Sequence, residues 1–213
     1  MKPYMSIPRV VVGKSDEYSS LEFIAFDKKD GSQIRAEFSR KQGFYKFGSR
    51  HVLLNEQHEQ LGKAISLIQD NYASNLSKIF KEQRWDSVIC FFEFYGSRSF
   101  AGNHHKDDDH QVLLFDVSPA KQGLIAPDPF IKLFNCVGIP TVLYQGSITD
   151  DFVESVRKST LPGMTLEGVV CKAANPNGKK TSQPIMYKIK SEKWLGMLRE
   201  FVAYDEELFQ RLM

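Results

Sequence analysis

The sequence is organised around residues 23–32, an apolar run that passes into two lysines and then into an Asp-Gly-Ser turn. Residues 33–38, after the turn, alternate between apolar and polar side chains, which is typical of a half-buried strand. Turn residues between two β-prone runs predict a hairpin or a looped connection. The pattern places Lys28 at the end of a buried strand, near Gly31, where the backbone lets a ligand approach closely.

Lys28 is a candidate nucleophile because of this position. Burial among apolar neighbours and the adjacent cation of Lys29 both disfavour the ammonium form of a lysine. A neutral lysine amine is a nucleophile. The alternative is a solvated turn that carries two surface lysines, and the residues downstream decide between the two interpretations.

The composition predicts a globular protein of ordinary character. The chain has 213 residues, of which 42% are hydrophobic and 25% charged, and its length suits one large domain or one domain with a small appendage. A net charge of +2 does not demand nucleic acid, although a local patch can still bind it. We see neither a membrane-span run nor a signal-peptide core, so we expect a cytoplasmic protein with no membrane partner.

Two sets of potential metal ligands are interpreted as structural. Cys90, Cys136 and Cys171 lie far apart in apolar contexts, so we expect small core residues in a reducing compartment. Residues 101–110 contain three histidines and three aspartates, a composition that invites a metal site. Glycine, asparagine and mixed charge in this short linker favour an exposed loop instead.

Hydrophobic periodicity predicts an α+β domain built on antiparallel sheet, with helices packed outside. We find no internal repeat and no convincing domain boundary, so a single domain over residues 1–213 is expected. Beyond the central stretch, strands are predicted at residues 9–13, 43–50, 87–96, 111–117, 141–144, 166–172 and 185–190. Helices are predicted at residues 56–81, 128–134, 150–159 and 192–213.

Charged side chains interrupt the apolar strands. Glu93 lies among aromatic residues and Glu167 opens an apolar strand. Lys188 and Lys190 share one face of another strand, by its period of two. Burying such groups is costly unless they pair with each other, a ligand or a metal. If they converge with Lys28, the cations suit the phosphates of a nucleoside triphosphate and a carboxylate suits Mg²⁺; the alternative is a set of rim charges or satisfied salt bridges.

A series of short motifs occurs in order along residues 23–190, each on a predicted strand or turn. They are Lys28-Lys29-Asp30-Gly31, a Ser-Arg element within residues 47–50, Phe-Glu-Phe-Tyr-Gly at 92–96, Leu-Phe-Asp-Val at 114–117, Leu-Glu-Gly-Val-Val-Cys-Lys at 166–172 and Lys188-Ile189-Lys190. This series resembles the motifs of the covalent nucleotidyltransferases, the polynucleotide ligases and mRNA capping enzymes, and is most similar to the RNA ligases. The resemblance implies an antiparallel-sheet nucleotidyltransferase fold, an ATP-grasp-like ligase adenylation domain.

The implied activity is that of an ATP-dependent RNA ligase. Such an enzyme forms a lysyl-AMP, transfers AMP to an RNA 5′-phosphate and joins that phosphate to a 3′-hydroxyl. The resemblance implies ATP and Mg²⁺ (or Mn²⁺) as cofactors, RNA ends as partners and DNA as a possible one. Lys28 would attack the α-phosphate, Lys188 and Lys190 would bind it and stabilise its charge, and Glu167 would bind the metal.

The remaining motif residues are implied in nucleotide binding. Glu93 would accept a hydrogen bond from a ribose hydroxyl, and Arg50 would contact the sugar or a phosphate. Phe115 would stack on adenine, as aromatic faces generally do with bases. Three further residues are assigned to nucleotide binding: Asp27, Arg35 and Lys172.

Several alternatives stay open. DNA nick sealing is one, against which the Phe-Glu-Phe-Tyr-Gly form of the third motif argues mildly; GTP-dependent capping is another, and a non-catalytic nucleotide- or nucleic-acid-binding module of the same fold is a third. The residues after Lys190 suffice for a helix, so we expect no C-terminal OB-fold or other second domain. The chain is then a minimal ligase, a truncated domain, or a protein that needs a separate partner or domain to grip its substrate.

Overall fold

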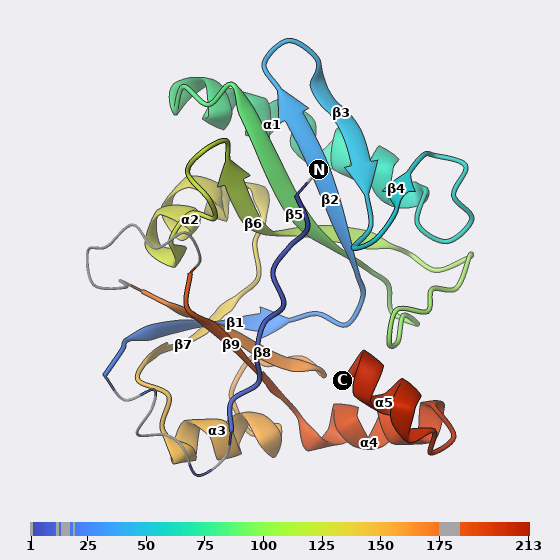
Figure 1. Cartoon of the computed structure of the whole chain (residues 1–213), viewed down its shortest axis with the longest axis vertical. Helices are drawn as coiled ribbons and strands as arrows, with labels where there is room; N and C mark the ends of the chain where they lie inside the picture. Colours follow the sequence, from blue (N-terminus) through green and yellow to red (C-terminus); the bar gives the residue numbers. More distant parts are fainter. Residues whose placement is uncertain (1, 12, 14–17, 19, 175–183) are drawn as a thin grey trace. The chain divides into compact units, whose positions relative to one another are not determined.

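The computed structural model describes residues 2–11, 13, 18, 20–174 and 184–213. These residues form two compact units, one comprising residues 1–6 and 31–140 and the other residues 7–30 and 141–213. Each unit contains one antiparallel sheet with helices (Figure 1). The α+β class and the antiparallel sheets predicted from the sequence are therefore confirmed. No helix among the described residues combines the length and apolar character that a bilayer crossing requires.

The first unit is built on a five-stranded sheet in the order β4-β3-β2-β5-β6. Its strands are β2 (Ser32–Ser39), β3 (Gly43–Gly48), β4 (Leu53–Leu54), β5 (Ser87–Tyr95) and β6 (Gln111–Pro119). Its helices are α1 (Lys63–Glu82), α2 (Pro127–Phe134) and the single 3-10 turn η2 (Asn135–Val137). The predicted pairing of residues 43–50 with the strand before them is confirmed, because β3 pairs with β2.

Helix α1 supplies much of the core of this unit. Its apolar residues recur at spacings of three and four and are buried, namely Ala64, Ile65, Ile68, Tyr72, Leu76 and Phe80. The Phe80 ring packs edge-on against Phe38 of β2, and Tyr72 packs edge-on against Phe92 of β5. The helix begins later than residue 56, the predicted start. Residues 56–62 instead form turns in which the Gly62 amide donates to the His58 carbonyl.

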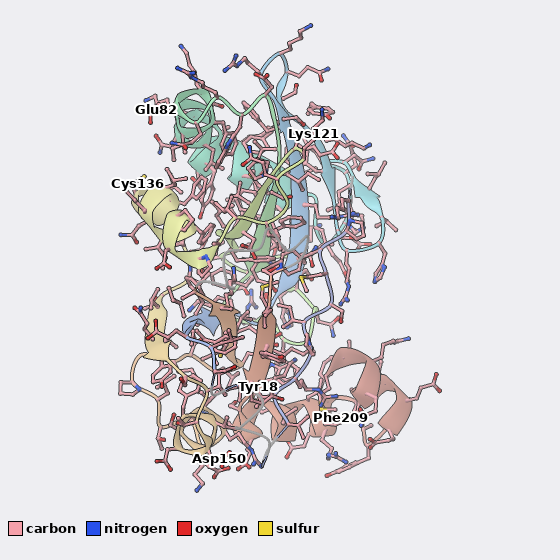
Figure 2. The ribbon with its side chains drawn as sticks, turned by 60° about the vertical axis from the view of Figure 1, so that its left-hand side comes forward. Tyr18, Glu82, Lys121, Cys136, Asp150 and Phe209 are labelled. Atoms are coloured by element: carbon pink, nitrogen blue, oxygen red, sulfur yellow. The ribbon has the colours of Figure 1, made fainter. Side chains whose placement is uncertain are left out.

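The second unit is built on a four-stranded sheet in the order β7-β1-β8-β9. Its strands are β1 (Phe23–Lys28), β7 (Val142–Gly146), β8 (Gly168–Ala173) and β9 (Met186–Lys190), and its helices are α3 (Asp150–Arg157), α4 (Glu192–Phe201) and α5 (Glu206–Leu212). Asp150 begins α3 (Figure 2). The buried Phe152 and Val156 of α3 join Phe23 of β1 in one apolar core.

The stretch around Lys28 forms a looped connection and not a hairpin. β1 pairs with β7 and β8, whereas β2 pairs with β3 and β5. Gly31 directly precedes β2. It must lack a side chain because an added Cβ would lie 2.3 Å from the Phe94 carbonyl oxygen. The turn after Lys28 therefore connects the four-stranded sheet, which contains β1, to the five-stranded sheet, which contains β2.

The C-terminal segment forms two helices where one was predicted. α4 ends at Phe201 and α5 begins at Glu206. Between them Ala203 and Tyr204 have φ values of 49° and 64°, which cannot continue a right-handed helix. The guanidinium of Arg199 in α4 lies 4.3 Å from the ring of Phe209, so α5 folds back on α4 (Figure 2).

Two further expectations are corrected. Of the strand predicted at residues 9–13, Val12 lies outside the described residues, and the others are not part of a strand; Arg9 makes an isolated parallel bridge to Lys188. Of the three cysteines, Cys90 and Cys171 are buried as expected, whereas Cys136 is exposed in η2 (Figure 2).

Candidate active site

A buried carboxylate brings two of the predicted catalytic lysines together. Glu167 Oε2 lies 2.8 Å from Nζ of Lys28, and its Oε1 lies 2.8 Å from Nζ of Lys190. Glu167 and Lys190 are 3% and 7% exposed, whereas a quarter of the Lys28 side chain is open to solvent. The two buried charged groups, Glu167 and Lys190, are therefore paired, as burial demands, and part of the Lys28 side chain remains exposed.

Sheet register produces this geometry. Gly168 at the start of β8 pairs with Lys28 on β1 and with Lys190 on β9. Gly168 has a φ of +136°, and an added Cβ would lie 2.1 Å from the Ile189 carbonyl oxygen. Only glycine fits here. Glu167 directly precedes the first residue of β8. From that position its side chain contacts both lysines.

Lys188, the third predicted catalytic residue, lies near the same group of charges. Burial, followed by the cations of Lys190, Lys28 and Arg9, lowers the pKa of Lys188 to about 8. Burial also lowers the pKa of Lys190, although its carboxylate partner Glu167 opposes the shift. The site therefore holds an excess of positive charge that a polyanion would neutralise.

The two adjacent lysines of the central stretch have different partners. Lys28 pairs with Glu167, whereas Lys29 pairs with Asp27 at 2.9 Å. Asp27 is buried and also accepts hydrogen bonds from the amide and the hydroxyl of Thr165, at 2.8 and 3.0 Å. These contacts hold the segment before Glu167 against the end of β1.

Trp194 is a site residue that sequence reasoning missed. Its indole N–H donates to Oδ2 of Asp30 at 2.8 Å, and Nζ of Lys190 lies 3.5 Å from its ring centroid. Ser191 caps α4 by accepting a hydrogen bond from the Trp194 amide. Its hydroxyl and its amide also donate to the carbonyls of Leu166 and Glu167, at 2.6 and 2.9 Å. The Ser-x-x-Trp cap directly after Lys-x-Lys was the available sequence signal.

Lys172, predicted to bind nucleotide, is buried on β8. Its Nζ lies 5.0 Å from the ring centroid of Phe26 on β1. The second unit thus contains Asp27, Lys28, Glu167, Lys172, Lys188 and Lys190 of the predicted site.

The first unit contains the other four predicted residues: Arg35, Arg50, Glu93 and Phe115. Arg35 is buried on β2, and its Nε donates to the carbonyl of Ser49 at 2.7 Å, which fixes the connection that carries the exposed Arg50. Phe115 on β6 packs edge-on against Tyr4, with ring centroids 5.1 Å apart.

Glu93 is half-buried on β5, opposite Gln33 of β2 and Leu113 of β6. Tyr4 packs on Phe115, and its hydroxyl donates a hydrogen bond to the buried carboxylate of Asp116. Tyr4 was not identified from the sequence because its contacts lie far along the chain.

The histidine- and aspartate-rich loop is partly buried, which corrects the expectation of an exposed loop. Asp108 accepts hydrogen bonds from the Arg98 amide and the Ser97 hydroxyl, both at 2.8 Å, and the Arg98 amide is the main reason that its pKa falls to about 2. His110 stacks on Phe94 at 4.6 Å. The described residues contain no group of three or more histidine, cysteine, aspartate or glutamate side chains placed to hold a metal ion.

Glu167 nevertheless fits the role of a metal ligand beside a nucleotide. Mg²⁺ is usually bound by one or two carboxylates together with substrate phosphates and water, so one glutamate suffices. The lysines around Glu167 supply complementary charge for those phosphates.

Similar proteins were found among solved structures and not by sequence. No protein-family model matches the sequence, and no curated protein matches it. A Naegleria gruberi RNA ligase solved with PPi superposes with a TM-score of 0.66 at 17% identity, over 94% of this chain and 58% of that chain. An archaeal ATP-dependent RNA ligase superposes with a TM-score of 0.65 at 15% identity, over 95% of this chain and 52% of that chain.

A putative ATP-dependent DNA ligase from Aquifex aeolicus also superposes, with a TM-score of 0.67 at 15% identity, over 100% of this chain and 57% of that chain. The chain thus spans little more than half the length of these proteins. At such identities the similarity establishes the fold, and the fold predicted from the sequence is confirmed. The chain has the fold of the nucleotidyltransferase domains of ATP-dependent RNA and DNA ligases.

Proposed function

We propose that the protein is an ATP-dependent RNA ligase that works through an AMP carried on Lys28. The observation that carries the proposal is the placement of the Glu167 carboxylate between Lys28 and Lys190, with Lys188 close by. A partly exposed lysine, a buried carboxylate and two further cations form the set that adenylyl transfer from ATP requires.

In the first step the neutral amine of Lys28 attacks the α-phosphorus of ATP. A nitrogen–phosphorus bond forms, the bond from the α-phosphorus to the oxygen bridging to the β-phosphate breaks, and pyrophosphate leaves with its electron pair. Glu167, whose oxygen accepts the hydrogen bond of the Lys28 amine, would take the proton that the ammonium loses before the attack, and water would take the second proton, which the nitrogen loses as its bond to phosphorus forms. Lys188 and Lys190 stabilise the charge on the α-phosphate.

A divalent metal at Glu167 would supply positive charge to the phosphates and favour the neutral form of a nearby amine. Structures of Naegleria gruberi RNA ligase variants with ATP and Mn, and with AMP and Mn, support this cofactor assignment. The protein's own contribution is to hold Glu167 through Ser191 and to hold Asp30 through Trp194.

Nucleotide recognition is assigned to the residues of the first unit. Phe115, fixed edge-on by Tyr4, offers an aromatic face for adenine. Glu93 is assigned to a ribose hydroxyl, and Arg50, on the connection that Arg35 fixes, to the sugar or a phosphate.

Two further steps complete ligation. An oxygen of the RNA 5′-phosphate attacks the lysyl-AMP phosphorus, and the Lys28 amine leaves and takes up a proton. The RNA 3′-hydroxyl then attacks the activated 5′-phosphate, loses its proton and displaces AMP. A second candidate is the same chemistry on DNA ends, because the Aquifex aeolicus structure, a putative DNA ligase, superposes over the whole chain.

The decisive experiment incubates the protein with Mg²⁺ and α-labelled ATP, or separately GTP, and follows covalent label on a denaturing gel. We expect label with ATP, none in Lys28→Ala, and a modest reduction in the matched control Lys29→Ala, because Lys29 pairs with Asp27 and not with Glu167. Label lost from Lys29→Ala and retained by Lys28→Ala would show that the nucleophile is misassigned. Transfer of the label to 5′-phosphorylated RNA or DNA then identifies the substrate.

A further inference from the structure

Arg9 is held beside Lys188 by the backbone of the N-terminal segment. The Lys188 amide donates to the Pro8 carbonyl at 2.9 Å, and the Val10 amide donates to the Lys188 carbonyl at 3.1 Å. These two bonds make Arg9 and Lys188 a parallel bridge pair. Side chains of paired residues on neighbouring strands lie on the same face, so Arg9 adds its cation to the face that carries Lys188.

Several charged groups lie close to Lys188. Arg9 acts on Lys188 together with Lys28 and Lys190, and each lowers its pKa. The carboxylates that act on Lys188 and Lys190 are those of Glu167 and Asp30. Among the described residues, these four cations therefore lie around the carboxylates of Glu167 and Asp30.

Both cations contact Met213, the last residue of the sequence. Nζ of Lys188 donates to a main-chain oxygen of Met213 at 3.2 Å, and Nη1 of the exposed Arg9 donates to the Met213 sulfur at 2.7 Å. A thioether is a weak acceptor. Phosphate oxygens would give Arg9 stronger, charge-assisted bonds, and its planar guanidinium suits a phosphate with two parallel bonds.

We propose that Arg9, beside Lys188, binds the β- and γ-phosphates of ATP and the pyrophosphate that they become. The proposal rests on the proposed function. As the nitrogen–phosphorus bond to Lys28 forms and the bond to the bridging oxygen breaks, the electron pair passes to pyrophosphate, and Arg9 meets the added negative charge. In the reverse reaction Arg9 holds the pyrophosphate that attacks lysyl-AMP. Transfer of AMP to a 5′-phosphate involves no pyrophosphate and does not depend on Arg9.

The test compares wild type with Arg9→Ala and with the control Lys193→Ala, an exposed lysine on α4 of the same unit. Inorganic pyrophosphate is titrated into the unmodified proteins by calorimetry. It is then added to proteins carrying labelled lysyl-AMP, and the half-saturating concentration for release of ATP is measured. We expect Arg9→Ala to weaken both by about tenfold, the typical effect of losing one hydrogen bond to a charged group. The control is expected to match wild type.

A third measurement separates binding from structure. AMP transfer from preformed lysyl-AMP to 5′-phosphorylated RNA is expected to proceed at the wild-type rate in Arg9→Ala. Unchanged pyrophosphate affinity, or an equal fall in AMP transfer, would overturn the proposal. If Arg9→Ala does not fold, Arg9→Gln, which keeps a long polar side chain without the charge, is judged by the same criteria. A wild-type protein that never forms lysyl-AMP would refute the proposed function, whereas the calorimetric titration would still decide the role of Arg9.

Discussion

The Glu167 carboxylate accepts a hydrogen bond from Nζ of Lys28 at 2.8 Å, across 139 residues of sequence. This contact joins the residue assigned as nucleophile to the residue assigned to the metal. In the proposed mechanism the Lys28 amine leaves this contact, and loses a proton, before it attacks the α-phosphorus of ATP. The mechanism therefore treats the contact as a resting arrangement that opens when nucleotide binds.

Glu167→Ala is expected to abolish most adenylylation and to destabilise the fold. The adenylylation rate should fall by about a hundredfold or more, in line with the loss of a charge-stabilising group. Lys190, which is 7% exposed, loses its carboxylate partner, and breaking a buried ion pair costs about 3 kcal/mol or more. Urea unfolding and single-turnover labelling measure the two effects. The exposed α4 variant Glu200→Ala should change neither; wild-type stability in Glu167→Ala would contradict the pairing.

Stability is expected to rise with pH above about 8 because of Lys188. The folded-state pKa of Lys188 is about 8, below its ordinary value of 10.5, so between these values the unfolded chain binds more protons than the folded one. The penalty is fully present below pH 8 and is relieved as the pH rises toward 10.5. Thermal unfolding over this range should show a shallower slope for Lys188→Gln than for wild type. Identical slopes would show that Lys188 is not buried among cations.

Gly168→Ala is expected to be strongly destabilising, by about 3 kcal/mol or more, because the new Cβ would lie 2.1 Å from a backbone oxygen at a φ of +136°. The matched control is Gly196→Ala in α4, where an added Cβ meets nothing within 4 Å. Alanine in a helix interior is favoured over glycine, so the control should gain up to about 1 kcal/mol. Chemical denaturation measures both, and equal effects would refute the close approach at Gly168.

Trp194→Phe tests the link between α4 and the lysine motif. Phenylalanine keeps an aromatic ring near Lys190 but removes the N–H that donates to Asp30. We expect a loss of about 1 kcal/mol, the usual net value of one hydrogen bond, and slower adenylylation. Asp30→Asn should not add its full effect to that of Trp194→Phe, because both remove the same contact. Additive effects in the double variant would show that the two residues act independently.

Local sequence patterns predicted most of the elements but fewer of their partners. Alternation and apolar runs identified β1, β2, β5, β6, β8 and β9, because each strand carries its own pattern. The looped connection after Lys28 was one of two predicted outcomes, since turn residues do not specify whether the flanking strands pair with each other. The break after α4 carries no glycine or proline, and Ala203 and Tyr204 adopt positive φ there without a sequence signal.

Residues of the candidate site could be predicted where a charged side chain interrupts an apolar pattern. Residues that give no such signal were missed. Glu167 and Lys190 were recognised in this way. Trp194 resembles an ordinary core residue of an amphipathic helix, and its contact with Asp30 spans 164 residues. Arg9 is placed by backbone hydrogen bonds of its neighbours, which no side-chain pattern records.

The pairing of β1 with β7 and β8, and not with β2, has a consequence for the order of events during synthesis. Phe23 and Ala25 are 0% exposed in the folded protein, yet the strands that cover them span residues 142–146 and 168–173. The five-stranded sheet draws its strands from residues 32–119 and so can form on the ribosome before those strands emerge. Lys28 is synthesised long before the strands that pair with β1, so its surroundings form only after those strands have emerged. A ribosome-bound nascent chain should therefore assemble the surroundings of Lys28 late, after a long interval in which β1 is an unpaired apolar segment.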